Sequence, residues 1–219
     1  MSTLVAMWTR ISRGYDPIPP SKNMGYAENF MYMCFGEKSD DEIVKLLDAC
    51  LILHAEHTIN ASTFSTMVTA STLSNPFSSI AAGVGTLAGP LHGNANENVL
   101  VMLDEIGSPK NARSWIEDRL KNKKVIWGMG HREYKTKDPR ATILEQMIKT
   151  YVNKTGHNLS ERFETALEVE SICEELLSHK GVYPNVDFYS GILYAELFKF
   201  TKEHFTSIFA MARSAGWVA

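Results

Sequence analysis

Apolar side chains recur at intervals of three and four residues in segment after segment of this chain, whereas alternation with a period of two is hardly sustained anywhere. The first spacing places apolar groups on one face of an α-helix, and the second is typical of a strand. We therefore expect an all-α protein.

Capping signals predict where several helices begin. Ser39, with Glu42 three residues later, forms a capping box ahead of an apolar run. Asp138 followed by Pro139 is a cap with proline at the first helical position. A helix is expected to begin in 4–8, and further helices are expected from Asn94 or Asn96 to 106 and at 163–177, 187–200 and 203–213. The Pro-rich segment 15–20 and the sequence Ser74-Asn75-Pro76 are expected to interrupt helices.

Composition and charge narrow the class of protein. Of 219 residues, 44% are hydrophobic and 21% are charged, as in ordinary globular proteins. A net charge of -3 excludes a chain-wide basic field for nucleic acid or anionic lipid, so any anion site must be local. No uninterrupted apolar stretch reaches the roughly 18 residues of a membrane span, which predicts a soluble protein. Cys34, Cys50 and Cys173 are odd in number and far apart, which favours a reducing compartment over a disulfide framework.

His54 and His57 continue the apolar stripe of the helix capped at Ser39, four and seven residues beyond Cys50. Helical spacing would place both on its inner face. Two interpretations stay open: hydrogen-bonded core histidines, or a metal pair that has no acidic or thiol ligand at a recognisable spacing.

His92 lies in the glycine-bounded turn GPLHG, just ahead of a predicted helix. The positive end of the helix dipole opposes protonation, so a neutral ring that donates a hydrogen bond is expected. Such a ring can stabilise a developing enolate oxygen, although a purely structural turn histidine fits the same pattern.

The segment 125–140 combines two close glycines, Gly128 and Gly130, with a run of cations. Glycines allow a ligand to approach the backbone, and cations can neutralise phosphates or carboxylates. The alternative is a solvated basic loop. The cations are Arg132, Lys135, Lys137 and Arg140.

Asp187 stands among apolar and aromatic neighbours at a predicted helix start. It is either a helix cap or a carboxylate that accepts a proton from carbon, and spacing alone does not choose between them.

Taken together and in order, five motifs closely resemble the citrate synthase family over the chain from about Leu4 to its last residue. They are HAEHTINAS, GPLHGNAN, GMGHREYKTKDPR, YPNVDFYSG and ARSAGW. The resemblance implies an all-α fold in which a small domain closes over the substrates held by a large one. The small domain would be 94–197, with 1–93 and 198–219 belonging to the large domain.

The resemblance also implies an acyltransferase that condenses acetyl-CoA with oxaloacetate to give citrate and CoA, without metal or cofactor. Asp187 would remove a proton from the acetyl methyl group, and His92 would hydrogen-bond the thioester oxygen. His131 would polarise and protonate the oxaloacetate carbonyl.

Binding roles follow from the same motifs. His57, His131, Arg140 and Arg213 would hold oxaloacetate. CoA would lie against the segment Ile126, Trp127, Gly128, Met129 and Gly130, with Lys135 and Lys180 near its phosphates.

A homodimer or a multiple of it, a bacterial-type cytoplasmic location and the tricarboxylic acid cycle are the corresponding expectations, with the mitochondrial matrix as the other compartment. A 2-methylcitrate synthase that takes propionyl-CoA resembles the same motifs, and a non-catalytic assembly module is a third interpretation. The family's N-terminal helical region and C-terminal basic tail are missing from this sequence, which predicts either a longer molecule or a reduced version.

Overall fold

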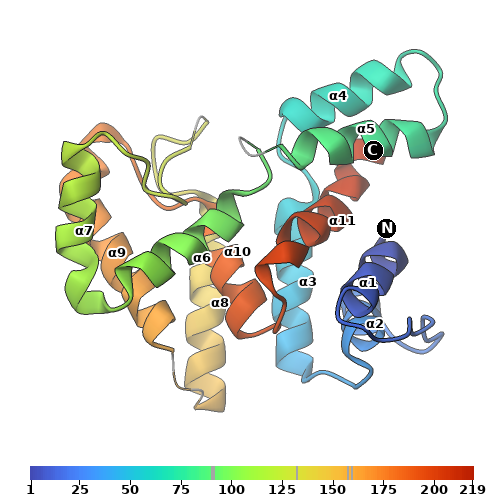
Figure 1. The fold of residues 1–219 in the computed structure, drawn as a ribbon, viewed down its shortest axis with the longest axis horizontal. Coiled ribbons are helices and arrows are strands. Elements are labelled where there is room, and N and C mark those ends of the chain that lie inside the picture. Colours follow the sequence, from blue (N-terminus) through green and yellow to red (C-terminus); the bar gives the residue numbers. More distant parts are fainter. Residues whose placement is uncertain (90–91, 132, 157, 159) are drawn as a thin grey trace. The chain divides into compact units, whose positions relative to one another are not determined.

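The computed structural model describes residues 1–89, 92–131, 133–156, 158 and 160–219, where the regular structure is helical (Figure 1). The prediction of an all-α fold is confirmed. The chain divides into two compact units: unit 1 is Met1–Asn94 with Glu203–Ala219, and unit 2 is Ala95–Lys202. The predicted large domain (1–93 and 198–219) and small domain (94–197) are defined by a closing motion of one over the other. That division therefore stays a prediction.

Unit 1 is built on the packing of α3 against α11. Its helices are α1 (Ser2–Ile11), α2 (Tyr26–Phe35), α3 (Asp41–Ala55), α4 (Ala61–Ala70), α5 (Pro76–Leu87) and α11 (Phe205–Val218). Phe30, Leu47, Cys50 and Phe205 are fully buried in it. A Cβ at Gly216 of α11 would lie only 2.3 Å from the Ala55 carbonyl oxygen, so glycine is needed for this close contact with the end of α3.

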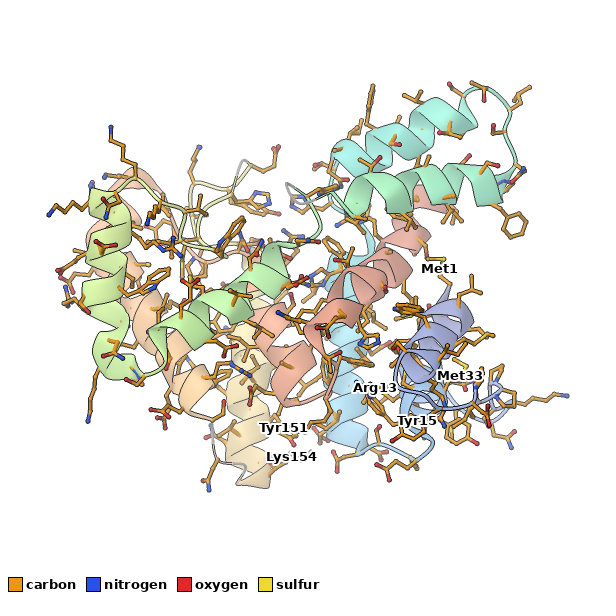
Figure 2. The ribbon with its side chains drawn as sticks, viewed as in Figure 1. Met1, Arg13, Tyr15, Met33, Tyr151 and Lys154 are labelled. Carbon is orange, nitrogen blue, oxygen red and sulfur yellow. The ribbon has the colours of Figure 1, made fainter. Side chains whose placement is uncertain are left out.

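The Pro-rich segment 15–20 is helix-free, as predicted, and is tied to α1 by Arg10. Arg10 donates from Nε to the carbonyl oxygen of Asp16, and its guanidinium lies 5.3 Å from the centroid of the Tyr15 ring. Arg13 lies 5.4 Å from the Phe35 ring centroid. Figure 2 labels Arg13 and Tyr15 at this end of α1.

Unit 2 is centred on α10, which packs against α6 and α8, while α9 packs against α6 and α7. Its helices are α6 (Ala95–Ile106), α7 (Pro109–Lys121), α8 (Pro139–Thr155), α9 (Glu161–Leu177) and α10 (Val186–Glu196). Val99, Ile116, Val169 and Phe188 are fully buried in its core. None of the helices in the described part of the chain is long and apolar enough to cross a membrane.

Most predicted helix starts are confirmed, but one cap is wrong. The cap of α3 is Asp40, whose Oδ1 accepts from the Glu42 amide at 2.8 Å, in place of Ser39. The starts of α6 after Asn94 and of α8 after Asp138 are as expected.

The last two helices end differently from the prediction. Helix α10 ends at Glu196 because Lys199 takes a positive φ of 59° and the Phe200 amide donates back to Tyr194. Helix α11 begins at Phe205 and continues to Val218.

Candidate functional site

The two histidines expected on one helical face are separated by the end of that helix. Helix α3 ends at Ala55, and Glu56 is extended, with φ of -145° and ψ of 146°. His54 is fully buried and donates from Nδ1 to the Cys50 carbonyl oxygen at 2.7 Å, which confirms the core interpretation for this residue. His57 lies half-buried in the following loop, so the prediction of a shared inner face is wrong.

The loop that carries His57 is organised by the cap of the next helix. Asn60 donates from Nδ2 to the His57 carbonyl oxygen at 3.1 Å. Its Oδ1 accepts from the Thr63 amide at 3.1 Å and from the Ser62 hydroxyl at 2.8 Å. Asn60 therefore caps α4 and also fixes the backbone of the loop at His57.

Ser62 orients His92. Its amide donates to Nε2 of His92 at 3.3 Å, and its hydroxyl oxygen lies 2.9 Å from the same nitrogen. An amide N–H can only donate, so Nε2 is an acceptor and the neutral ring carries its proton on Nδ1. The single proton of the Ser62 hydroxyl is then shared between Nε2 and Asn60 Oδ1. Burial and the charge of Arg213 lower the pKa of His92, which favours this neutral form.

Arg213 of α11 brings the HAEH and ARSAGW motifs together within unit 1. It is buried, donates from Nε to the His54 carbonyl oxygen at 2.8 Å and lies 4.9 Å from the Phe209 ring centroid. A buried guanidinium is a strong recognition group for a carboxylate, because little water competes for its donors.

In unit 2 the segment 126–130 runs beside 183–185. The Gly130 amide donates to the Tyr183 carbonyl oxygen at 2.7 Å, and the Asn185 amide donates to that of Gly128 at 2.9 Å. The Asn185 side chain also donates to the Gly130 carbonyl oxygen at 2.9 Å. Gly128 has a φ of 77°, and a Cβ there would lie 2.8 Å from the Phe188 ring, so this packing requires glycine.

His131 has a fixed tautomer as well. Its Nδ1 accepts from the Glu133 amide at 3.0 Å, so a neutral ring carries its proton on Nε2. Burial and the neighbouring Arg140 charge lower the pKa of His131 against the opposing effect of Asp138 and Glu133.

Arg140 is held at the start of α8 by Asp138. Asp138 Oδ1 accepts from Arg140 Nε at 3.1 Å, and Oδ2 accepts from Nη2 at 2.8 Å. Burial opposes ionisation of Asp138, but the hydrogen bonds and charge of Arg140 outweigh it and hold its pKa below the ordinary value. A cation in a first helical turn opposes the helix dipole, and Asp138 offsets this cost.

Asp187 lies in the first turn of α10 and is half-buried between Val186 and Phe188, which are both buried. Its amide donates to Asn185 Oδ1 at 3.0 Å, so Asn185 is the cap. The interpretation of Asp187 as the helix cap is therefore wrong.

The cations of the basic segment separate into different roles. Lys137 faces inward, where Nζ bonds Glu145 at 2.6 Å and also Glu170, so the expectation that it neutralises a ligand is wrong. Lys135 and Lys180 are exposed, and their segments meet where a Cβ at Gly181 would lie 3.2 Å from the Lys135 carbonyl oxygen. Arg132, and Pro90 and Leu91 of the GPLHG turn, lie outside the described residues.

Three further side chains matter to which the sequence analysis gave no role in the site: Asn60, Ser62 and Asp138. Asn60 and Ser62 lie within the HAEHTINAS motif, where an Asn ahead of a helix is a capping signal. Asp138 was recognised only as a cap. In the ranges that the structure describes, no three His, Cys, Asp or Glu side chains cluster as a metal site.

Comparison with known proteins identifies sequences that are similar to this chain. The whole chain, residues 1–219, matches the family model "Citrate synthase, C-terminal domain". The citrate synthase of Acidithiobacillus ferridurans is 52% identical over 219 residues, which are 100% of this chain and 56% of that protein. A 2-methylcitrate synthase of Mycobacterium tuberculosis is 38% identical over 220 residues, covering 100% of this chain and 54% of the relative.

Solved structures agree with these relatives. The citrate synthase of Pyrobaculum aerophilum superimposes with a TM-score of 0.92 at 41% identity, covering 99% of this chain and 54% of that one. The citrate synthase of Thermoplasma acidophilum, solved as a ternary complex with carboxymethyl coenzyme A and oxaloacetate, superimposes with a TM-score of 0.90 at 35% identity. The match covers 99% of this chain and 57% of that one. The chain therefore spans little more than half the length of the proteins it matches.

Proposed function

Because this chain belongs to the citrate synthase family, we propose that its protein condenses acetyl-CoA with oxaloacetate and water to give citrate and CoA. This is an acyl transfer, and it is the entry step of the tricarboxylic acid cycle. The proposal concerns the whole protein, since the relatives are longer than the chain.

The pair of oriented histidines carries the proposal. Condensation involves two carbonyl groups that each gain negative charge, the thioester oxygen and the ketone oxygen. Each needs a hydrogen-bond donor that is not itself a strong acid. His92 offers Nδ1–H and His131 offers Nε2–H, because a backbone amide occupies the other nitrogen of each ring.

Asp187 supplies the base. Its carboxylate takes a proton from the acetyl methyl group, while His92 stabilises the enol or enolate oxygen by donating from Nδ1. The new carbon–carbon bond forms at the ketone carbon of oxaloacetate, and His131 passes the Nε2 proton to the ketone oxygen. Water then cleaves the citryl thioester, which releases citrate and CoA.

The carboxylates of oxaloacetate and the phosphates of CoA are matched by cationic side chains. Oxaloacetate carries two carboxylates, for which Arg140 and Arg213 are the cationic partners, with His57 and His131 as further donors. CoA lies along the backbone of 126–130, and the exposed Lys135 and Lys180 meet its phosphates. No metal or cofactor enters these steps.

The alternative function is that of a 2-methylcitrate synthase, which would take propionyl-CoA in place of acetyl-CoA. One of the relatives of this chain carries that name. One added methylene changes the free energy of a pocket by only about 1–3 kcal/mol, so it leaves the catalytic groups unchanged. Both enzymes would act as homodimers or as multiples of them, a state that the mass of the native protein measures.

Release of free thiol, with oxaloacetate present and either acetyl-CoA or propionyl-CoA as partner, tests the proposal. We expect faster release from acetyl-CoA and none when oxaloacetate is omitted. Preference for propionyl-CoA would support the alternative. Helical, self-associating protein without turnover for either substrate would instead indicate the non-catalytic assembly module.

A further inference from the structure

Asp138 joins two elements of unit 2 through one buried carboxylate, whose residue is only 1% exposed. Oδ1 accepts from the Arg140 amide at 2.9 Å as well as from Nε. Oδ2 accepts from Arg140 Nη2 and from the Val186 amide at 3.2 Å. Val186 is the first residue of α10 and precedes Asp187, so Asp138 links the cation on α8 to the helix that carries the base.

The residue before Asp138 is anchored to the same region. Lys137 bonds Glu145 of α8 and Glu170 of α9, and the Tyr189 hydroxyl of α10 donates to the other carboxylate oxygen of Glu170. The Asp138 amide donates to the Pro184 carbonyl oxygen at 3.4 Å. The residue before Asp138 is therefore tied by its side chain to α8 and α9, and through Glu170 to α10, while the Asp138 backbone is bonded to Pro184.

This arrangement sets the orientation of the Arg140 guanidinium. Nε and Nη2 both face the Asp138 carboxylate, which defines the plane of the group. Nη1 makes no hydrogen bond within the part of the chain that the structure describes. Nη1 therefore keeps its N–H groups for a bond to a ligand carboxylate.

We propose that Asp138 is a positioning residue for the carboxylate site, holding the guanidinium plane of Arg140 and the start of α10 in one arrangement. A substrate carboxylate bound to Arg140 then has a fixed position relative to Asp187. This inference rests on the proposed function for the identity of the ligand, oxaloacetate.

Electrostatics alone predicts the opposite effect of removing Asp138. A negative charge beside Arg140 weakens its attraction for an anion, so simple loss of that charge should tighten oxaloacetate binding. A positioning role predicts weaker binding, because an asparagine side chain at this position has only one acceptor atom for donors that now occupy two. The direction of the change separates the two explanations.

The experiment measures the dissociation constant of oxaloacetate by calorimetry on the intact protein and on Asp138→Asn. We expect an increase of about ten-fold or more. Asp40→Asn is the matched control, since Asp40 caps α3 through the same spacing to an amide but contacts no arginine in the described structure. It should leave the constant unchanged. Binding of Asp138→Asn that is unchanged or tighter would overturn the proposal.

Repeating the Asp138 substitution in a protein that already lacks Arg140 distinguishes a positioning role from a general loss of structure. In Arg140→Leu, adding Asp138→Asn should change the dissociation constant less than about two-fold, because the group through which Asp138 acts is already gone. The same fold loss in both backgrounds would indicate a merely structural role and contradict the proposal.

Hydrogen exchange gives a readout that does not depend on the substrate. Asp138→Asn should accelerate exchange of the Val186 amide and of the Arg140 Nε–H, while the Asp187 amide, bonded to Asn185, keeps its rate. If the unchanged protein fails to bind oxaloacetate, the proposed function is overturned. Unchanged protection of Val186 and Arg140 would overturn the Asp138 linkage itself.

Discussion

The two units hold the residues around their histidines by different physical means. In unit 1, His92 is oriented by the uncharged groups of Ser62, which Asn60 in turn supports. In unit 2, His131 and Arg140 belong to a segment held by ionised side chains, with Asp138 against Arg140 and Lys137 against two glutamates. In both units a backbone amide bonded to one ring nitrogen leaves the neutral ring with one defined donor.

This difference predicts different consequences of mutation. Uncharged hydrogen bonds contribute modestly to stability, so changes in the His92 region should alter rate more than folding. Breaking a half-buried ionic network leaves charges without partners, so changes in unit 2 should alter binding and stability together. The following substitutions test that contrast.

Asp187→Asn should give the largest effect, a loss of turnover of about 10³-fold, because the amide cannot act as a base. Binding of oxaloacetate should remain within about two-fold, since Asp187 does not hold the dicarboxylate. Thiol release and calorimetry measure the two quantities. Asp104→Asn, an exposed carboxylate of the same unit, is the control. Unchanged turnover in Asp187→Asn would remove its role as base.

Arg140→Leu should weaken oxaloacetate binding by about 100-fold and also lower thermal stability, because it leaves Asp138 buried without its cation. Calorimetry and thermal unfolding measure these effects. Arg119→Leu is the control, because it breaks an ion pair with Glu105, whose carboxylate is more exposed than that of Asp138. An unaltered dissociation constant in Arg140→Leu would exclude this arginine from the site.

Glu170→Gln should lower the free energy of unfolding by about 2–3 kcal/mol, because Glu170 receives bonds from both Lys137 and Tyr189 and is 9% exposed. Chemical denaturation measures the change. Glu175→Gln breaks an exposed pair with Arg113 and should have no measurable effect. Equal destabilisation by both variants would contradict the importance of burial in this network.

Ser62→Ala should slow turnover about ten-fold with little change in stability, since the amide still donates to Nε2 of His92 but the hydroxyl is lost. Steady-state kinetics and thermal unfolding measure the two. Ser65→Ala on the same helix is the control, because the Ser65 hydroxyl bonds only the Ala82 carbonyl oxygen in the described structure. A larger effect on folding than on rate would contradict the contrast between the units.

The smallest effect should be on the pH dependence of stability. The pKa values of His92 and His131 lie below the ordinary value in the folded protein, so the unfolded chain binds protons first. Stability should therefore fall as the pH drops below about 6.5. Denaturation at several pH values should show a shallower fall for His92→Asn and His131→Asn, and an unchanged slope would contradict the assignment.

Asp138 affects stability at lower pH than the histidines do. Its pKa is held below the ordinary value, so its contribution to stability is present above about pH 4 and is lost as the pH falls through the folded pKa. The two ranges are separate, so one titration distinguishes the histidines from Asp138.

Local patterns predicted much of the fold. The period of apolar residues indicated helices throughout, and Asp138-Pro139 marked a true helix start. Ser74-Asn75-Pro76 was expected only to interrupt helices, and the structure shows that Pro76 also begins α5. The Ser39 cap was wrong because Asp40, one residue later, binds the Glu42 amide. Neighbouring residues with equal capping ability are not separated by pattern alone.

By itself the sequence determined the helical class, most helix starts and the residue types available for the chemistry, because these depend on neighbours within a few positions. Only the tertiary structure decided the orientation of each group. Ser62 reaches His92 across 30 positions, Asp138 reaches Val186 across 48, and Arg213 reaches His54 across 159. Tautomers, charge states and the inward turn of Lys137 depend on such contacts, which arise only when distant segments pack together.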